Sequence, residues 1–172
     1  MIRAMNLRFC LAGAFALSMF AHSAMAITGA WSGQLQDSNG GEESVTYRFS
    51  PTGNPILRFQ TRQGYRDMEL QAVGQRHEWL LRGQGWARGT VEALSVGPDR
   101  VQVVVSIYTE SGGGSLLDQS TRRLGLDFVQ SANAVHVTVV HDTQSYGSGA
   151  GLGLYAGRRA ARIQRGTLYQ AR

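Results

Sequence analysis

Short extended segments separated by turn residues dominate this chain, and that pattern restricts its fold more than any other feature. From residue 28 onward, stretches of strand length are bounded by Gly, Pro, Asn, Asp and Ser. Val45, Tyr47 and Phe49 alternate with polar residues, which is the period of a half-buried strand. Helical periodicity is almost absent after residue 26. The pattern therefore predicts an all-β protein.

Turn signals divide the chain into about ten expected strands. Turn chemistry is clearest at residues 51–54 and 97–99, whereas residues 111–115 and 144–153 are predicted to be glycine-rich loops. The expected strands cover residues 28–36, 45–50, 56–61, 65–73, 77–82, 86–96, 101–108, 116–130, 134–141 and 154–169. Since short connections favour antiparallel neighbours, we predict a single antiparallel β-barrel or sandwich of about 8–10 strands. A barrel is favoured because it leaves no exposed sheet edge.

Residues 1–26 have the three parts of a secretory signal peptide in the expected order. Two arginines lie within the first eight residues, residues 9–20 form an apolar run, and Ala24-Met25-Ala26 is a small-x-small cleavage site. The apolar run is shorter than the roughly 20 residues of a transmembrane helix. We therefore predict a β-barrel domain over residues 27–172, located in the periplasm or outside the cell and without a transmembrane helix.

Positive charge is concentrated at the end of the chain. The sequence has 17 basic and 12 acidic residues, for a formal net charge of +5, and every basic residue is arginine. After residue 152 there are arginines but no acidic residues. Along an extended strand, Arg158 and Arg162 share one face and Arg165 lies on the other. Guanidinium groups bind carboxylate and phosphate in pairs of hydrogen bonds, so this strand is predicted to attract an anionic envelope component. Nucleic acid is not an expected partner, because the chain is exported and its net charge is small.

The opening of the predicted mature chain, Ile27-Thr-Gly-Ala-Trp-Ser-Gly-Gln-Leu35, resembles that of a known superfamily. Gly29-x-Trp31 on a first strand is similar to the start of lipocalins and related calycin barrels, and the stretch looks even more like the start of avidins and streptavidins. The resemblance implies that Trp31 closes one end of a barrel and that an arginine on the last strand, Arg162 or Arg165, packs over it. The biotin-contacting pattern and the lipocalin cysteine pair have no counterpart here, so the resemblance implies a fold and not a ligand.

Residue patterns for catalysis and metal binding are weak. The single cysteine lies within the signal segment, and no zinc motif is present. His136 and His141 are five apart, which places them on opposite faces of a strand. Asp67 and Glu69 share a strand face, as two glycosidase carboxylates can, but such pairs are far more common on an outer surface. We predict no enzymatic activity, no metal and no cofactor.

These observations favour a non-enzymatic binding protein for a small amphipathic or anionic envelope ligand. In this interpretation Trp31 closes the barrel, residues 144–153 gate it and the arginines steer anions. The candidate ligand-binding residues are Trp31, Trp79, Trp86, Tyr146, Arg158, Arg162 and Arg165. The main alternative is a periplasmic protein-interaction module, such as an inhibitor or assembly factor. A hydrolase with a carboxylate site and a small outer-membrane barrel are two further rivals.

Overall fold

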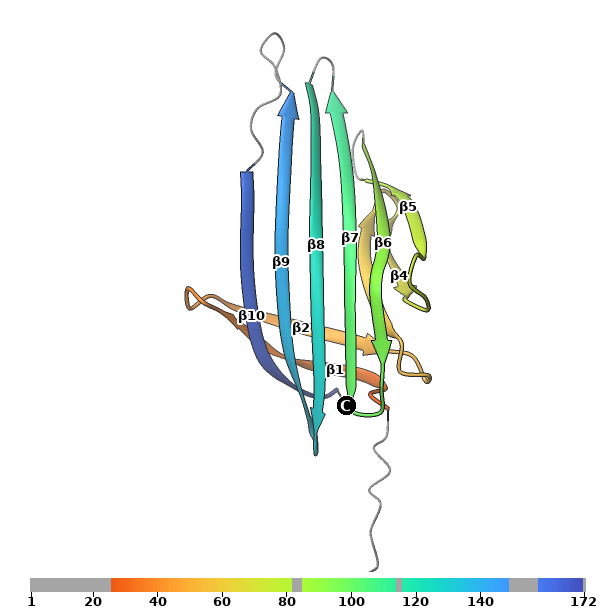
Figure 1. Cartoon of the computed structure of the whole chain (residues 1–172), viewed down its shortest axis with the longest axis vertical. Coiled ribbons are helices and arrows are strands. Elements are labelled where there is room, and N and C mark those ends of the chain that lie inside the picture. The colour runs from red at the N-terminus through yellow and green to blue at the C-terminus, as the bar shows by residue number, and fades with distance from the viewer. Residues whose placement is uncertain (1–25, 82–84, 114–115, 149–157, 172) are drawn as a thin grey trace, which may run out of the picture.

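A computed structural model describes residues 26–81, 85–113, 116–148 and 158–171. Within these ranges the chain forms ten antiparallel strands in one strongly curled sheet, and it has no helix (Figure 1). The prediction of an all-β fold is confirmed, with one sheet instead of the two sheets of a sandwich. The described residues contain no helix that could span a membrane. Almost all of the predicted signal segment lies outside the described residues.

The ten strands are β1 (Gly29–Asp37), β2 (Glu42–Phe49), β3 (Pro55–Thr61), β4 (Gly64–Glu69), β5 (Arg76–Leu80), β6 (Gly85–Val96), β7 (Arg100–Gly113), β8 (Leu116–Ser131), β9 (Ala134–Ser148) and β10 (Arg158–Gln170). Each strand overlaps one predicted segment, although β4 ends earlier and β7 and β9 end later than predicted. Their order in the sheet is β4-β3-β2-β1-β10-β9-β8-β7-β6-β5. Apart from β4 and β5, strands that are consecutive in the chain pair with each other, and the first strand pairs with the last. The sheet edges β4 and β5 are the only consecutive strands that do not pair in the part described.

Both glycine-rich loop predictions were wrong over part of their length. Residues 144–148 do not start a loop, because they continue β9 as far as Ser148 and pair with β8 there. Glycine at 147 does not interrupt the ladder, since a glycine keeps the backbone N–H and C=O groups that form it. Similarly, β7 extends through residues 111–113 of the loop predicted at residues 111–115. The predicted loop residues 149–153 and 114–115 lie outside the described residues.

The core forms where β1 and β2 cross the inner face of the long strands β7–β10 (Figure 1). Phe128 of β8 is fully buried there, and its ring meets those of Tyr47 and Phe49 edge-on at centroid distances of 5.0 Å each. Every second residue of β7, from Val101 to Val105, is buried beside it. This is the period-two burial that the alternating sequence predicts.

The pairing of β1 with β10 joins the first and last strands of the sheet. Gly33 lies opposite Leu168 and Leu35 lies opposite Gly166, so that each leucine faces a residue without a side chain. Both leucines are buried. A Cβ atom on either glycine would overlap the backbone of the partner strand. The absence of these two side chains therefore permits a close contact between the strands.

Trp31 lies in the core, near the start of β1 and opposite the end of β10. It is 5% exposed, and its indole Nε1 donates a hydrogen bond of 2.8 Å to the Thr28 carbonyl. The register places Gln170 opposite Trp31, whereas Arg165 pairs with Gln36 farther along β1.

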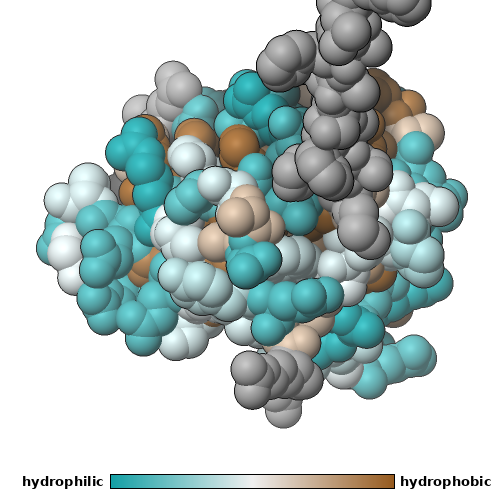
Figure 2. All heavy atoms as spheres, turned by 90° about the horizontal axis from the view of Figure 1, so that it is seen from below, coloured by the Kyte–Doolittle hydropathy of each residue, from teal (hydrophilic) through white to brown (hydrophobic). Residues whose placement is uncertain are grey.

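Seen from below, the surface not covered by residues outside the described ranges is mainly hydrophilic or neutral, with hydrophobic side chains in small separate groups (Figure 2).

Candidate binding cleft

A gap opens in the wall of the curled sheet between β2 and β3. These strands share only two register pairs, Arg48 with Ile56 and Phe49 with Pro55. Beyond them, β2 crosses the molecule with its hairpin partner β1 (Figure 1). A cleft of about 440 Å³, which we name the β2–β3 cleft, lies in this gap. Its size falls within the roughly 300–1,000 Å³ typical of small-molecule sites.

The β2–β3 cleft has an apolar wall and a cationic part. Apolar side chains from the inner faces of β3, β7 and β8 form the wall, namely Leu57, Phe59, Ile107 and Leu124. Tyr47 and Arg122 add a hydroxyl and a guanidinium group on the same face. An apolar wall beside a fixed cation is suited to an amphipathic molecule with a negative group.

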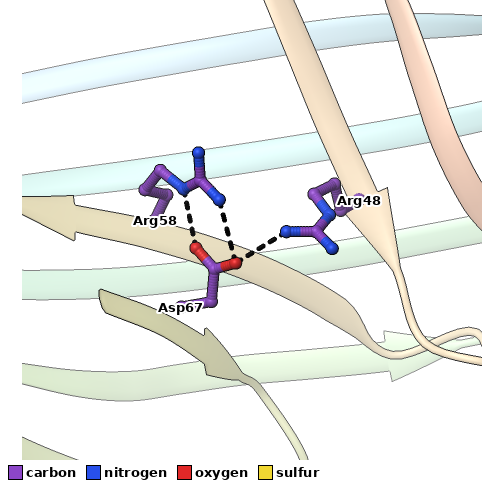
Figure 3. A network of polar contacts seen from close by, with 3 residues as sticks. All are labelled: Arg48, Arg58 and Asp67. Carbon is purple, nitrogen blue, oxygen red and sulfur yellow. Dashed lines mark hydrogen bonds and ion pairs between the residues drawn. The ribbon is translucent and has the colours of Figure 1, made fainter. Parts of the chain in front are cut away.

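Three charged side chains hold the outer rim of the cleft together (Figure 3). Asp67 of β4 accepts hydrogen bonds from Arg58 of β3 at 2.7 and 3.1 Å and from Arg48 of β2 at 2.6 Å. The hydrogen bond from Arg58 is the main cause that lowers the pKa of the Asp67 carboxyl group from its ordinary value of 3.8. The network therefore connects β2 to β3 and β4 at the point where backbone pairing between β2 and β3 ends.

This network predicts how Asp67 titrates. The carboxyl group of Asp67 should titrate below pH 3.8 in the folded protein, and its ion pairs should be present above that range and lost as the pH falls through the lowered pKa. In Arg58→Gln its midpoint should move up toward 3.8, because the strongest donor is removed. Carboxyl carbon chemical shifts measured by NMR test this. Arg100→Gln, which removes a partner of Asp127 instead, should leave the Asp67 midpoint unchanged; an equal shift there would contradict the prediction.

A chain of hydrogen bonds crosses four strands on the inner face and ends at the cleft. Arg122 Nη2 lies 2.6 Å from His141 Nδ1, His141 Nε2 lies 2.9 Å from Gln164 Oε1, and Gln164 Nε2 lies 3.1 Å from Glu43 Oε2. A guanidinium group can only donate, so His141 Nδ1 accepts and its Nε2–H donates to Gln164. We name this arrangement, Arg122–His141–Gln164–Glu43, the polar chain. Gln164 is only 1% exposed, so these bonds satisfy a buried amide.

Burial shifts the pKa of His141 in the polar chain and of Tyr47 in the β2–β3 cleft. Burial is the main cause that lowers the pKa of His141 below 6.5; the charges of Arg122 and Arg162 lower it further, while Gln164 and Glu43 oppose the shift. Burial also raises the pKa of Tyr47 to about 12. The Tyr47 hydroxyl is therefore uncharged and able to donate or accept a hydrogen bond.

The candidate residues from the sequence do not form one group. Arg162 lies on the inner face opposite His141 and forms an ion pair with Asp37 at 3.1 Å. Trp79 also lies on the inner face, where its ring packs against Phe59 at 4.7 Å. Trp31 is in the core instead, as described above. Of these three, Arg162 is the one whose strand position is adjacent to the polar chain.

The other candidates lie on the outer face or have side chains that are not described. Trp86 is opposite Glu110 and packs with Tyr108 at 5.4 Å on the outer face. Arg165 follows the buried Gln164 and is likewise on the outer face. Arg158 and Tyr146 belong to β10 and β9, but their side chains lie outside the description. Sequence reasoning did not select Tyr47, Arg122, Gln164 or Glu43.

Two of the weaker sequence signals are explained by their positions. Asp67 and Glu69 share the outer face, and hydrogen bonds from Arg58 and Asn54 respectively are the main causes that lower the pKa values of their carboxyl groups. Neither carboxyl group is suited to donate a proton near neutral pH. His136 is exposed on the outer face, opposite to the face of His141. No group of three or more His, Cys, Asp or Glu that could hold a metal ion occurs among the described residues.

Two further surfaces could take a ligand or partner. A smaller pocket of about 260 Å³ lies at the seam between the unpaired edges β4 and β5, beside Phe59 and Trp79. On the outer face, one apolar residue from each of β6 to β10 forms a row directly across the sheet, and the row consists of Ala93, Val104, Gly125, Val140 and Ile163. We name it the outer apolar row.

Comparisons of this chain with protein-family models, with curated proteins and with solved structures found no match. The functional assignment therefore depends on the geometry of the β2–β3 cleft and of the polar chain.

Proposed function

We propose that this chain is an exported, non-enzymatic binding protein whose ligand is a small amphipathic molecule held in the β2–β3 cleft. The observation that carries the proposal is the cleft itself, which combines about 440 Å³ of space with an apolar wall and the guanidinium group of Arg122. The export signal in residues 1–26 supports a location in the periplasm or outside the cell.

The chemistry of the cleft supports a ligand that has an apolar body. Ile107 and Leu124 are partly buried and pack against the core, so part of their apolar surface faces the cleft. Covering such surface contributes about 25 cal/mol per Å². The cationic groups lie at one side and at the rim, where the polar end of a bound amphipath can stay hydrated. The inner residues that line the cleft come from β2, β3, β7 and β8, whose positions the core fixes, so the site is formed before the ligand arrives.

Binding of an uncharged fluorescent probe tests the proposal. N-phenyl-1-naphthylamine, which brightens in apolar surroundings, is expected to bind the purified protein saturably at one site. Leu124→Asn should weaken this binding about tenfold, because the apolar wall loses a contact worth about 1.5 kcal/mol. Val140→Asn is the matched control, since Val140 is on the outer face of the neighbouring strand and is 40% exposed. Fluorescence titrations of the three proteins give the dissociation constants.

The results separate the cleft from the outer face. If the probe does not bind saturably to the unaltered protein, the proposed function is wrong. If Val140→Asn weakens binding while Leu124→Asn does not, the probe occupies the outer apolar row, and the cleft is not the site. Thermal unfolding of both variants checks that neither has lost the fold.

A protein-interaction module is the second candidate, and the outer apolar row is the observation that favours it. Val140 and Ile163 are 40% and 42% exposed, and they are adjacent across β9 and β10. Contiguous exposed apolar side chains are typical of interaction sites. We place this candidate second because a protein-interaction module would not use the β2–β3 cleft, whereas a binding protein for a small molecule would.

A further inference from the structure

We propose that the bound molecule has an anionic group, that Arg122 is the residue that binds it, and that protonation of His141 frees Arg122 to do so. This inference rests on the proposed function, and it adds the chemical class of the ligand's polar end and its dependence on pH. The class is a carboxylate, sulfonate or phosphate group, which a guanidinium group binds with two hydrogen bonds.

The direction of the polar chain is the basis of the inference. Arg122 has only donors, and its Nη2 is 2.6 Å from His141 Nδ1. The bond therefore exists only while Nδ1 carries no proton. At the same time Nε2 must carry one, because it lies 2.9 Å from Gln164 Oε1, whose amide nitrogen donates to Glu43. Neutral His141 thus fits both neighbours at once and occupies one of the N–H donors of Arg122, the one on Nη2.

Protonation removes this fit. A second proton on His141 goes to Nδ1, where a donor then faces the donor of Arg122 and two positive charges stand side by side. Arg122 must then move away from the imidazole. Since Arg122 already lines the β2–β3 cleft, its free N–H groups remain available to an anion there. The bond from His141 to Gln164 is unaffected, because Nε2 keeps its proton.

The charges that face His141 make the site positive only after protonation. Arg122 faces it from β8, Arg162 and the amide of Gln164 from β10, and Glu43 from β2. Arg162 is paired with Asp37 of β1. While His141 is neutral, the two guanidinium groups are balanced by the carboxylates of Glu43 and Asp37. The added proton makes the group net positive, which also favours an anion.

The pKa of His141 sets the direction of the pH dependence. The pKa of His141 lies below 6.5, chiefly because of burial, so the polar chain is intact at neutral pH and opens as the pH falls through the lowered pKa. The same shift means that the folded state loses stability as the pH falls from the ordinary value toward the lowered one. Binding of an anion to the opened state should offset this loss, because ligand and proton then favour the same arrangement.

Two probes with the same aromatic skeleton test the proposal. The anionic probe is 8-anilino-1-naphthalenesulfonate, and the uncharged one is N-phenyl-1-naphthylamine. As the pH falls from about 8 through the lowered pKa of His141, the affinity of the sulfonate should rise by about fivefold or more, and that of the uncharged probe should change by less than about twofold. The sulfonate stays charged throughout, so the change belongs to the protein. The uncharged probe also reports any acid-induced exposure of the core.

Variants assign the effect to the named residues. In His141→Gln, the amide can accept from Arg122 and donate to Gln164 but cannot be protonated, so the affinity for the sulfonate should not depend on pH. Arg122→Gln should abolish the rise at low pH. His136→Gln is the matched control, since His136 is exposed on the outer face of the same strand, and it should behave as the unaltered protein does.

The outcomes separate this inference from the proposed function. If neither probe binds the unaltered protein, the proposed function fails. If both probes bind but the affinity for the sulfonate does not rise, or rises equally in His141→Gln, only the role of Arg122 and His141 is overturned. Retained binding of the uncharged probe by each variant shows that the cleft is still formed.

Discussion

Replacing Phe128 with alanine is expected to lower the free energy of unfolding by about 3–5 kcal/mol. Phe128 is fully buried, and its ring contacts Tyr47 and Phe49 where β2 crosses β8. Removing the ring leaves a cavity at this crossing, because the two rings on β2 are attached to a paired strand and cannot close it. Edge-to-face contacts between aromatic rings add to the loss beyond the buried area. Urea denaturation followed by tryptophan fluorescence measures the change.

Val129→Ala is the control for this prediction. Val129 is the next residue of β8, but its side chain points outward and is 38% exposed. Its truncation should change the free energy of unfolding by less than about 1 kcal/mol. If Phe128→Ala does not fold, Phe128→Leu provides the measurement, with a smaller loss than alanine would give. Equal effects at positions 128 and 129 would contradict the placement of the core at this crossing.

Gly166→Ala is expected to destabilise the protein by about 3 kcal/mol, although alanine is the smallest possible addition. The new Cβ would lie 2.9 Å from Leu35 Cδ2 and closer still to the backbone oxygen of Gln34. A backbone atom cannot move aside as a side chain can, so β1 and β10 would have to separate. Thermal and urea unfolding measure the loss.

The same substitution should also disturb the polar chain. Gln164 lies two residues before Gly166 on the same face of β10, so a shift of that strand moves the amide that joins His141 to Glu43. Gly125→Ala is the matched control, because its Cβ would meet Val140 Cβ at an ordinary 3.7 Å. The control should stay within about 1 kcal/mol of the unaltered protein. A loss at Gly125 as large as at Gly166 would contradict close approach as the cause.

Local sequence was sufficient for the strands and turns because their signals lie within a few residues. The alternation of Val45, Tyr47 and Phe49 with polar residues predicted a half-buried strand; Phe49 is buried, and Val45 and Tyr47 pack against the core. The turn at residues 97–99 is closed by the Gly97 amide, which donates 2.8 Å to the Arg100 carbonyl. Glycine-rich ends were harder to interpret. Gly147 in β9 looks like a loop residue by composition, yet it pairs with Asp118 because backbone groups alone make the ladder.

The candidate site was much less accessible from the sequence. Alternation correctly placed His136 and His141 on opposite faces, but it could not predict which residues each histidine contacts. Arg122 meets His141 only because β8 and β9 pair with Leu124 opposite His141, and a shift of one residue would turn the Arg122 side chain to the other face. The arginines after residue 152 formed a cluster without acidic residues and so indicated an anion site. Arg122 lies in a segment that also contains acidic residues, so its sequence surroundings did not indicate one.

Local sequence patterns were enough to predict that the chain forms antiparallel strands, where most of them begin and which residues of each strand share a face. These properties follow from the two-residue period of a strand and from the backbone preferences of turn residues. Tertiary packing, by contrast, determines that β1 pairs with β10, that β2 separates from β3 to leave a cleft, and that Glu43 contacts Gln164 across 121 positions of sequence. Register and curvature bring these groups together, and both are set by the packing of the whole sheet, which no local segment encodes.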